Sequence, residues 1–167
     1  QAVSRGLGDV YKRQVQPQWF SYFATDVRRV AEFLELPFAA ARPDPVIQHV
    51  DADGRRHTDS EQPYIYRLTR LGALAEELGK GIEFADEVSA LIWGGTKGWD
   101  QGDHLAQATA RAGLNLAEMD ERIVAETERL EAVINNNQRD HDQSGHWGVP
   151  TCTYNGEPFF CLLYTSD

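Results

Sequence analysis

The sequence predicts a mostly α-helical chain of the α/β class that ends in one β-hairpin. Most of the chain repeats apolar residues at steps of three and four, the spacing of one helix face, as in Phe84, Val88 and Leu91. Beyond residue 147 this period gives way to two short segments around Asn155-Gly156, a pair that favours a two-residue hairpin turn. An apolar fraction of 41% is typical of a folded domain.

Helical spacing and stop signals divide the chain into successive elements. We expect helices over about 18–36, 63–79, 84–93 and 103–112, and a helical stretch over 116–134 that is either one helix or two with a break near Thr127. Pro37 ends the first helix, and a loop rich in Pro, Asp, Gly and Arg follows over 37–60. Asp103 is expected to cap one helix, and Asn115 with Glu118 resembles a capping box for the next.

The C-terminal hairpin consists of Thr151–Tyr154 and Glu157–Phe160. Alternation along the first strand places Cys152 and Tyr154 on one face, and Cys152 is most simply a small core residue. Two strands alone are marginally stable in water, so this hairpin needs partners. The sequence has no earlier strand of comparable quality, which suggests that part of a larger sheet is missing.

Composition limits the classes of function. The net charge of -10 disfavours nonspecific binding to nucleic acid or to an anionic membrane surface. No run approaches the roughly 20 apolar residues of a membrane span. With two cysteines, no C-x-x-C pair and no zinc-type spacing of Cys and His, we expect a cytoplasmic protein without a metal.

The two ends differ from the rest of the sequence. Residues 1–14 and 161–167 resemble translated adapter sequence, and we expect both to be non-native. Residues 15–147 would then form a helical insertion domain, and residues 148–160 a proline loop with the C-terminal hairpin.

Several stretches occur in the order found in one known family. They are Leu36-Pro37-Phe38, Arg42-Pro43-Asp44-Pro45, Phe84-Ala85-Asp86-Glu87, Leu91-Ile92-Trp93, Leu105-Ala106-Gln107-Ala108, Ala112-Gly113-Leu114, Gly148-Val149-Pro150-Thr151 and Asn155-Gly156-Glu157-Pro158-Phe159-Phe160. Together they resemble the DsbA-like thioredoxin-fold family, in its branch of 2-hydroxychromene-2-carboxylate isomerases and kappa-class glutathione transferases. The resemblance implies a thioredoxin-like fold with a large helical insertion, truncated here at both ends. Members of this family are often homodimers, so the resemblance also implies a homodimer as one possible assembly.

The resemblance further implies a glutathione-dependent enzyme. Glutathione would pair with the main chain of Val149, before a cis peptide bond to Pro150. Trp147 would either line the ligand site or pack the helices onto the sheet. The thiolate of glutathione would add to an unsaturated or electrophilic aromatic-derived substrate. The serine that favours this thiolate matches no residue of this chain, so the truncated chain is expected to contain no catalytic residue and to be inactive.

Two other functions remain open at this point. One is a DsbA-like thiol-disulfide oxidoreductase, and the other is a non-catalytic helical binding domain with a fortuitous hairpin. The loop over 42–60 could also face a substrate through the basic side chains of Arg42, His49, Arg55, Arg56 and His57, although a solvated surface loop is the simpler explanation.

Overall fold

The computed structural model describes residues 18–53, 56–146, 148 and 151–160. Within these residues the chain forms six helices and two separate two-stranded sheets. The elements are α2 Gln18–Phe33, β1 Gln48–Val50, β2 Arg56–Thr58, α3 Ile65–Glu77, α4 Gly81–Trp93, α5 His104–Arg111, α6 Leu116–Ala125, α7 Thr127–Gln143, β3 Thr151–Tyr154 and β4 Glu157–Phe160. The predicted mostly helical class with a C-terminal hairpin is therefore confirmed.

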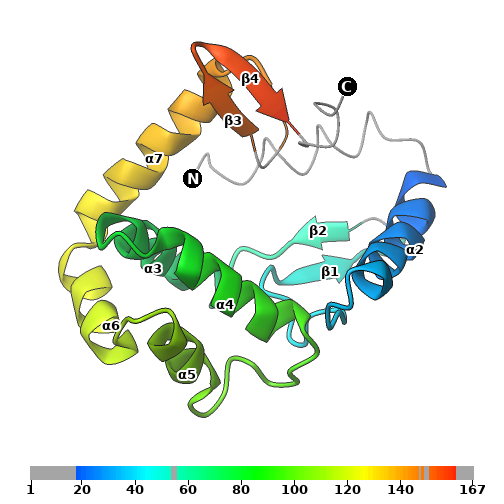
Figure 1. Ribbon diagram of the computed structural model, residues 1–167, viewed down its shortest axis with the longest axis horizontal. Coiled ribbons are helices and arrows are strands. Elements are labelled where there is room, and N and C mark those ends of the chain that lie inside the picture. The colour runs from blue at the N-terminus through cyan, green and yellow to red at the C-terminus, as the bar shows by residue number, and fades with distance from the viewer. Residues whose placement is uncertain (1–17, 54–55, 147, 149–150, 161–167) are drawn as a thin grey trace.

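Helices α3 to α7 form the body of the molecule, with α3 and α4 at its centre (Figure 1). Its core contains fourteen buried apolar residues, among them Leu71, Leu74 and Leu130, which are fully buried. The predicted apolar face Phe84, Val88, Leu91 and Ile92 of α4 lies in this core. The helical spacing in the sequence thus identified the surface on which the helices pack.

Two of the expected helix-end signals act as predicted and one does not. The Asn115 side chain accepts hydrogen bonds from the backbone N–H groups of Ala117 and Glu118, as a cap should. Gly79 has a φ of 69°, a left-handed conformation that ends α3. Asp103 precedes α5 but its side chain does not cap the helix; it accepts a hydrogen bond from the Gln107 side chain at 2.7 Å instead.

Helices α6 and α7 are separated at Glu126, so the stretch expected to be one helix or two consists of two helices. The Thr127 hydroxyl donates to the carbonyl oxygen of Ile123 at 2.7 Å, one turn back. Such bonding to a carbonyl of the preceding turn is associated with bends in helices. Beyond the break, Arg129 and Glu131 in the first turns of α7 pair with Glu77 and Arg70 of α3, and the helix then extends away from the body (Figure 1).

The expected irregular loop over 37–60 contains a second hairpin, which is a correction to the sequence prediction. Strands β1 and β2 pair antiparallel, with His49 opposite His57. Each strand has only three residues, and every described side chain in them is exposed. Asp53-Gly54 is a turn signal in the sequence, but strands this short and exposed lack the alternation of apolar and polar residues that predicts a strand.

The C-terminal hairpin forms as predicted, with Asn155 and Gly156 at φ values of 51° and 81°. It pairs Thr151 with Phe160 and Tyr154 with Glu157, and no further strand joins it in the described part of the chain. Cys152 is exposed, and Tyr154 is 71% exposed. The expectation that Cys152 is a core residue is wrong, because the described residues place nothing over that face.

Candidate functional site

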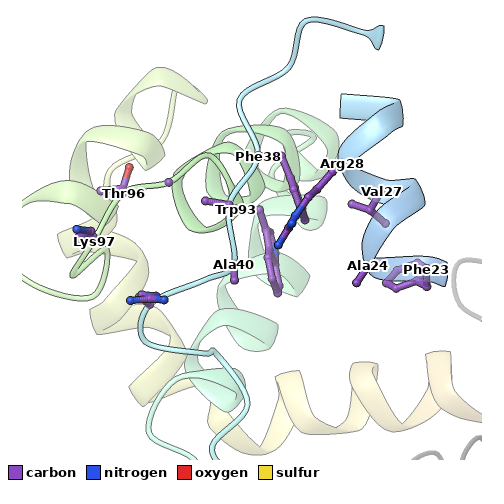
Figure 2. Close-up of a pocket in the computed structure, with 12 residues that line it drawn as sticks. Phe23, Ala24, Val27, Arg28, Phe38, Ala40, Trp93, Thr96 and Lys97 are labelled. Atoms are coloured by element: carbon purple, nitrogen blue, oxygen red, sulfur yellow. The ribbon is translucent and has the colours of Figure 1, made fainter. Parts of the chain in front are cut away.

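A pocket of about 890 Å³ lies between α2, the segment that follows it, and the loop after α4 (Figure 2). Its twelve lining residues are Phe23, Ala24, Val27, Arg28, Phe38, Ala39, Ala40, Arg42, Trp93, Gly95, Thr96 and Lys97. A volume in this range fits a drug-sized or cofactor-sized molecule.

Backbone hydrogen bonds connect two of the three segments that build the pocket. The Ala39 N–H donates to the carbonyl oxygen of Trp93 at 2.7 Å, and the Gly98 N–H donates to that of Arg42 at 2.9 Å. Residues 39–42 therefore run beside residues 93–98, and Arg42 forms a parallel bridge with Lys97. The peptide bond between Arg42 and Pro43 is cis.

The segment that lines the pocket up to Arg42 is also joined to the helical core by a hydrogen bond. The indole N–H of Trp99 donates to the carbonyl oxygen of Pro43 at 2.8 Å, and Trp99 is only 2% exposed. The Tyr64 ring packs edge-on against Trp99, and its hydroxyl donates to Asp100 at 3.0 Å. This bond raises the pKa of Tyr64, because it stabilises the protonated phenol beside a carboxylate.

The third wall is provided by α2. Phe23 and Val27, and likewise Ala24 and Arg28, are four residues apart and so occupy one side of the helix. Figure 2 shows these side chains directed from α2 toward the pocket, opposite Phe38 and Trp93. Phe23, Phe38 and Trp93 are each between 42% and 48% exposed, which leaves a large aromatic surface open to a ligand.

The charged groups of the pocket all have the same sign. Arg28, Arg42 and Lys97 line it, and none of the lining residues is acidic. Among the residues that the structure describes, no carboxylate forms an ion pair with any of these three side chains. The pocket therefore combines aromatic walls with unneutralised positive charge, in a protein whose net charge is -10. Such a site can bind an apolar molecule that carries an anionic group.

The site residues implied by the resemblance cannot be placed. Trp147, Val149 and Pro150 lie outside the described residues, as does the bond expected to be cis. Of the basic loop residues whose side chains the structure describes, only Arg42 lines the pocket. His49 and His57 instead pair with Asp59 and Asp51 on the β1–β2 ribbon.

Two pocket residues, Arg28 and Lys97, were not recognised in the sequence as candidates. Nothing in the local sequence distinguishes them from solvated surface cations, because their common location depends on where the fold places α2 relative to the loop after α4. Trp93 appeared in the sequence only within the stretch Leu91-Ile92-Trp93 of the family resemblance. The partial exposure of its ring at the pocket depends on the tertiary fold.

No group of three or more His, Cys, Asp or Glu side chains is arranged to bind a metal within the described residues. A search of the described helices finds none that is long and apolar enough to cross a bilayer. Comparisons with family models, curated proteins and solved structures give no match to this chain.

Proposed function

We propose that this pocket binds a small aromatic-derived or unsaturated carboxylate, as the substrate-binding part of a glutathione-dependent isomerase or transferase. The observation that supports the proposal is one pocket lined by three aromatic side chains and by three cations that pair with no described carboxylate, with no acidic residue among the described lining residues. Aromatic walls favour a flat apolar body, and the cations favour a carboxylate over a neutral group.

The glutathione-dependent chemistry in this proposal comes from the resemblance described above. In that reaction a thiolate adds to an unsaturated or electrophilic centre of the substrate and either leaves again or stays attached. We assign no catalytic residue in this chain. The alternative, a thiol-disulfide oxidoreductase, would carry a Cys-x-x-Cys pair in place of the thiolate-favouring serine at the start of the first helix of the resembled fold, a position that no residue of this chain matches.

Positive charge in the pocket contributes to binding only where it is close to the ligand. At 0.1 M salt the Debye length is about 10 Å, so the distant carboxylates of this acidic protein are largely screened. Arg28, Arg42 and Lys97 line the pocket and would act within that distance. Binding should therefore weaken as salt is raised.

Titration calorimetry with cinnamate, an unsaturated aromatic carboxylate, tests the proposal. We expect measurable binding of cinnamate, and weaker binding of cinnamamide, which has the same shape without the charge. Lys97→Gln and Arg42→Gln should each weaken cinnamate binding about fivefold, which corresponds to about 1 kcal/mol. Arg29→Gln is the matched control, since Arg29 adjoins Arg28 on α2 but does not line the pocket.

Equal binding of the acid and the amide, or an equal loss with Arg29→Gln, would refute an anion-selective pocket.

The binding of glutathione tests the glutathione-dependent part of the proposal. The resemblance gives this chain only the contact at Val149 and Pro150, so we expect glutathione alone to bind more weakly than micromolar. Micromolar binding would mean that the chain contains more of the glutathione site than the resemblance implies.

A further inference from the structure

The β1–β2 ribbon brings two histidines together. His49 lies directly opposite His57 in the antiparallel register. Their imidazole rings are stacked, with centroids 5.4 Å apart and planes inclined by 22°. The side chains are 61% and 49% exposed, so water and ions reach both rings.

Each ring uses one nitrogen for a carboxylate and leaves the other without a protein partner in the described residues. The Nδ1 atom of His49 contacts Oδ1 of Asp59, and the Nε2 atom of His57 contacts Oδ2 of Asp51 at 2.5 Å. Since the protonated nitrogen donates to the carboxylate, a neutral ring then has its lone pair on Nε2 of His49 and on Nδ1 of His57.

The carboxylates and the strands are themselves fixed. The second oxygen of Asp51 accepts a hydrogen bond from the Asp53 N–H at 3.0 Å. At the other end of the ribbon, the Gln62 side chain accepts from the Ile47 N–H and donates to the carbonyl oxygens of Ile47 and Asp59, each at 2.9 Å. These bonds hold the two strands in register, so the histidines stay opposed.

We infer that His49 and His57 together bind a divalent transition-metal ion. A metal-binding histidine almost always donates its other ring N–H to a carboxylate or carbonyl, and both rings here already have that partner. Imidazole suits Cu²⁺, Ni²⁺ and Zn²⁺, and Cu²⁺ binds most tightly in the general order of affinities. This inference departs from the sequence expectation that the protein has no metal.

The site supplies two protein ligands, and water completes the coordination. The planes of the stacked rings are inclined by only 22°, so one ring must turn about its side-chain bonds and give up its carboxylate contact to share an ion with the other ring, which keeps its own. Both rings are about half exposed or more, which leaves room for this rotation. The described residues offer no group of three or more His, Cys, Asp or Glu side chains around an ion, so these two imidazoles would be its protein ligands.

Titration of the full chain with CuCl₂, followed by electron paramagnetic resonance, tests the inference. We expect one Cu²⁺ with a two-nitrogen spectrum, and His49→Ala or His57→Ala should weaken its binding at least about tenfold and reduce the spectrum to one nitrogen. His104→Ala, which changes an exposed histidine at the start of α5, is the matched control and should leave both readouts unchanged.

A second variant addresses the carboxylates. Asp59→Asn leaves both imidazoles in place but weakens the partner of His49, and copper affinity should fall by about tenfold. Because all of these side chains are on an exposed ribbon, circular dichroism should show unchanged helix content. Copper binding that persists in the His49→Ala His57→Ala double variant, or that falls equally with His104→Ala, would overturn the inference.

Discussion

Positively charged side chains form ion pairs in the helical body, whereas those that line the pocket pair with no described carboxylate. From α3 to the first turn of α7, apart from the loop that contains Lys97, every arginine and lysine pairs with a carboxylate at 2.6 to 2.9 Å. These pairs are Arg67 with Asp120, Arg70 with Glu131, Lys80 with Glu83, Arg111 with Glu87, Arg122 with Glu126, and Arg129 with Glu77. The pocket cations Arg28, Arg42 and Lys97 have no such partner in the described part of the chain. Four of the pairs in the body connect different helices, whereas the charge at the pocket remains available to a ligand.

The same contrast holds for apolar side chains. In the body, Leu71, Leu74 and Trp99 are essentially inaccessible to solvent. Around α2, large apolar side chains remain open, including Phe33 at 86% and Leu36 at 59%. Helix α2 lies to one side of the body, beyond the β1–β2 ribbon (Figure 1). Stability should therefore depend on the body, and ligand binding on the segments around the pocket.

The largest expected effect concerns the core of the body. Leu71→Ala removes a fully buried side chain where α3 packs in the core, and should lower the free energy of unfolding by about 2 to 5 kcal/mol. Ile82→Ala, at a position 82% exposed on α4, should change it by no more than about 0.5 kcal/mol. Urea unfolding followed by circular dichroism measures both. Similar values for the two variants would show that the body has no fixed core.

A smaller effect on stability and on binding is expected when a paired arginine of the body or a lysine of the pocket is replaced. Arg67 donates two hydrogen bonds to Asp120, at 2.8 and 2.6 Å, and so joins α3 to α6. Arg67→Gln should cost about 0.5 to 1 kcal/mol in urea unfolding and leave cinnamate binding unchanged. Lys97→Gln should do the reverse, with stability within about 0.5 kcal/mol of the parent chain. If both variants changed both quantities, the division between body and pocket would be wrong.

The smallest expected effect concerns how the stability of the folded chain changes as the pH falls. The pKa of Glu126 is lowered by hydrogen bonds from Arg122 and Arg129, and that of Glu77 by Arg129. Carboxyl groups whose pKa is lower in the folded chain stabilise it above the ordinary value of 4.5, and this stabilisation is lost as the pH falls below that value.

Arg129→Gln should consequently flatten the fall in the urea midpoint between about pH 5 and pH 3. Arg139→Gln provides the control on the same helix, because the only described partner of Arg139 is the uncharged Asn136. An unchanged acid profile in Arg129→Gln would exclude these ion pairs as a source of the pH dependence.

The sequence predicted those parts of the fold that depend on local spacing. The buried face of α4 and the cap at Asn115 follow from residues within a few positions of each other. The same holds for the turn at Asn155 and Gly156. Strands β1 and β2 were missed because three exposed residues carry no periodic signal. The exposure of Cys152 was also missed, since alternation assigns a face but not what covers it.

The candidate sites depended on contacts between distant residues, and so the sequence revealed them only in part. Arg42 was recognised as a candidate, but Lys97 is 55 positions further along the chain and reaches the same pocket through backbone pairing. His49 and His57 were noted as basic loop residues, and their separation of eight positions matches no familiar metal motif. Their opposition becomes visible only when the two strands are placed in register.

The Gln62 side chain closes the base of the β1–β2 ribbon, and this has a practical consequence for engineering. The hydrogen bonds of this side chain join the two strands at the end of the ribbon opposite its turn. We therefore expect peptide tags or fluorophores introduced at the turn to perturb the ribbon and not the helical body, which makes the turn a suitable position for labelling this protein.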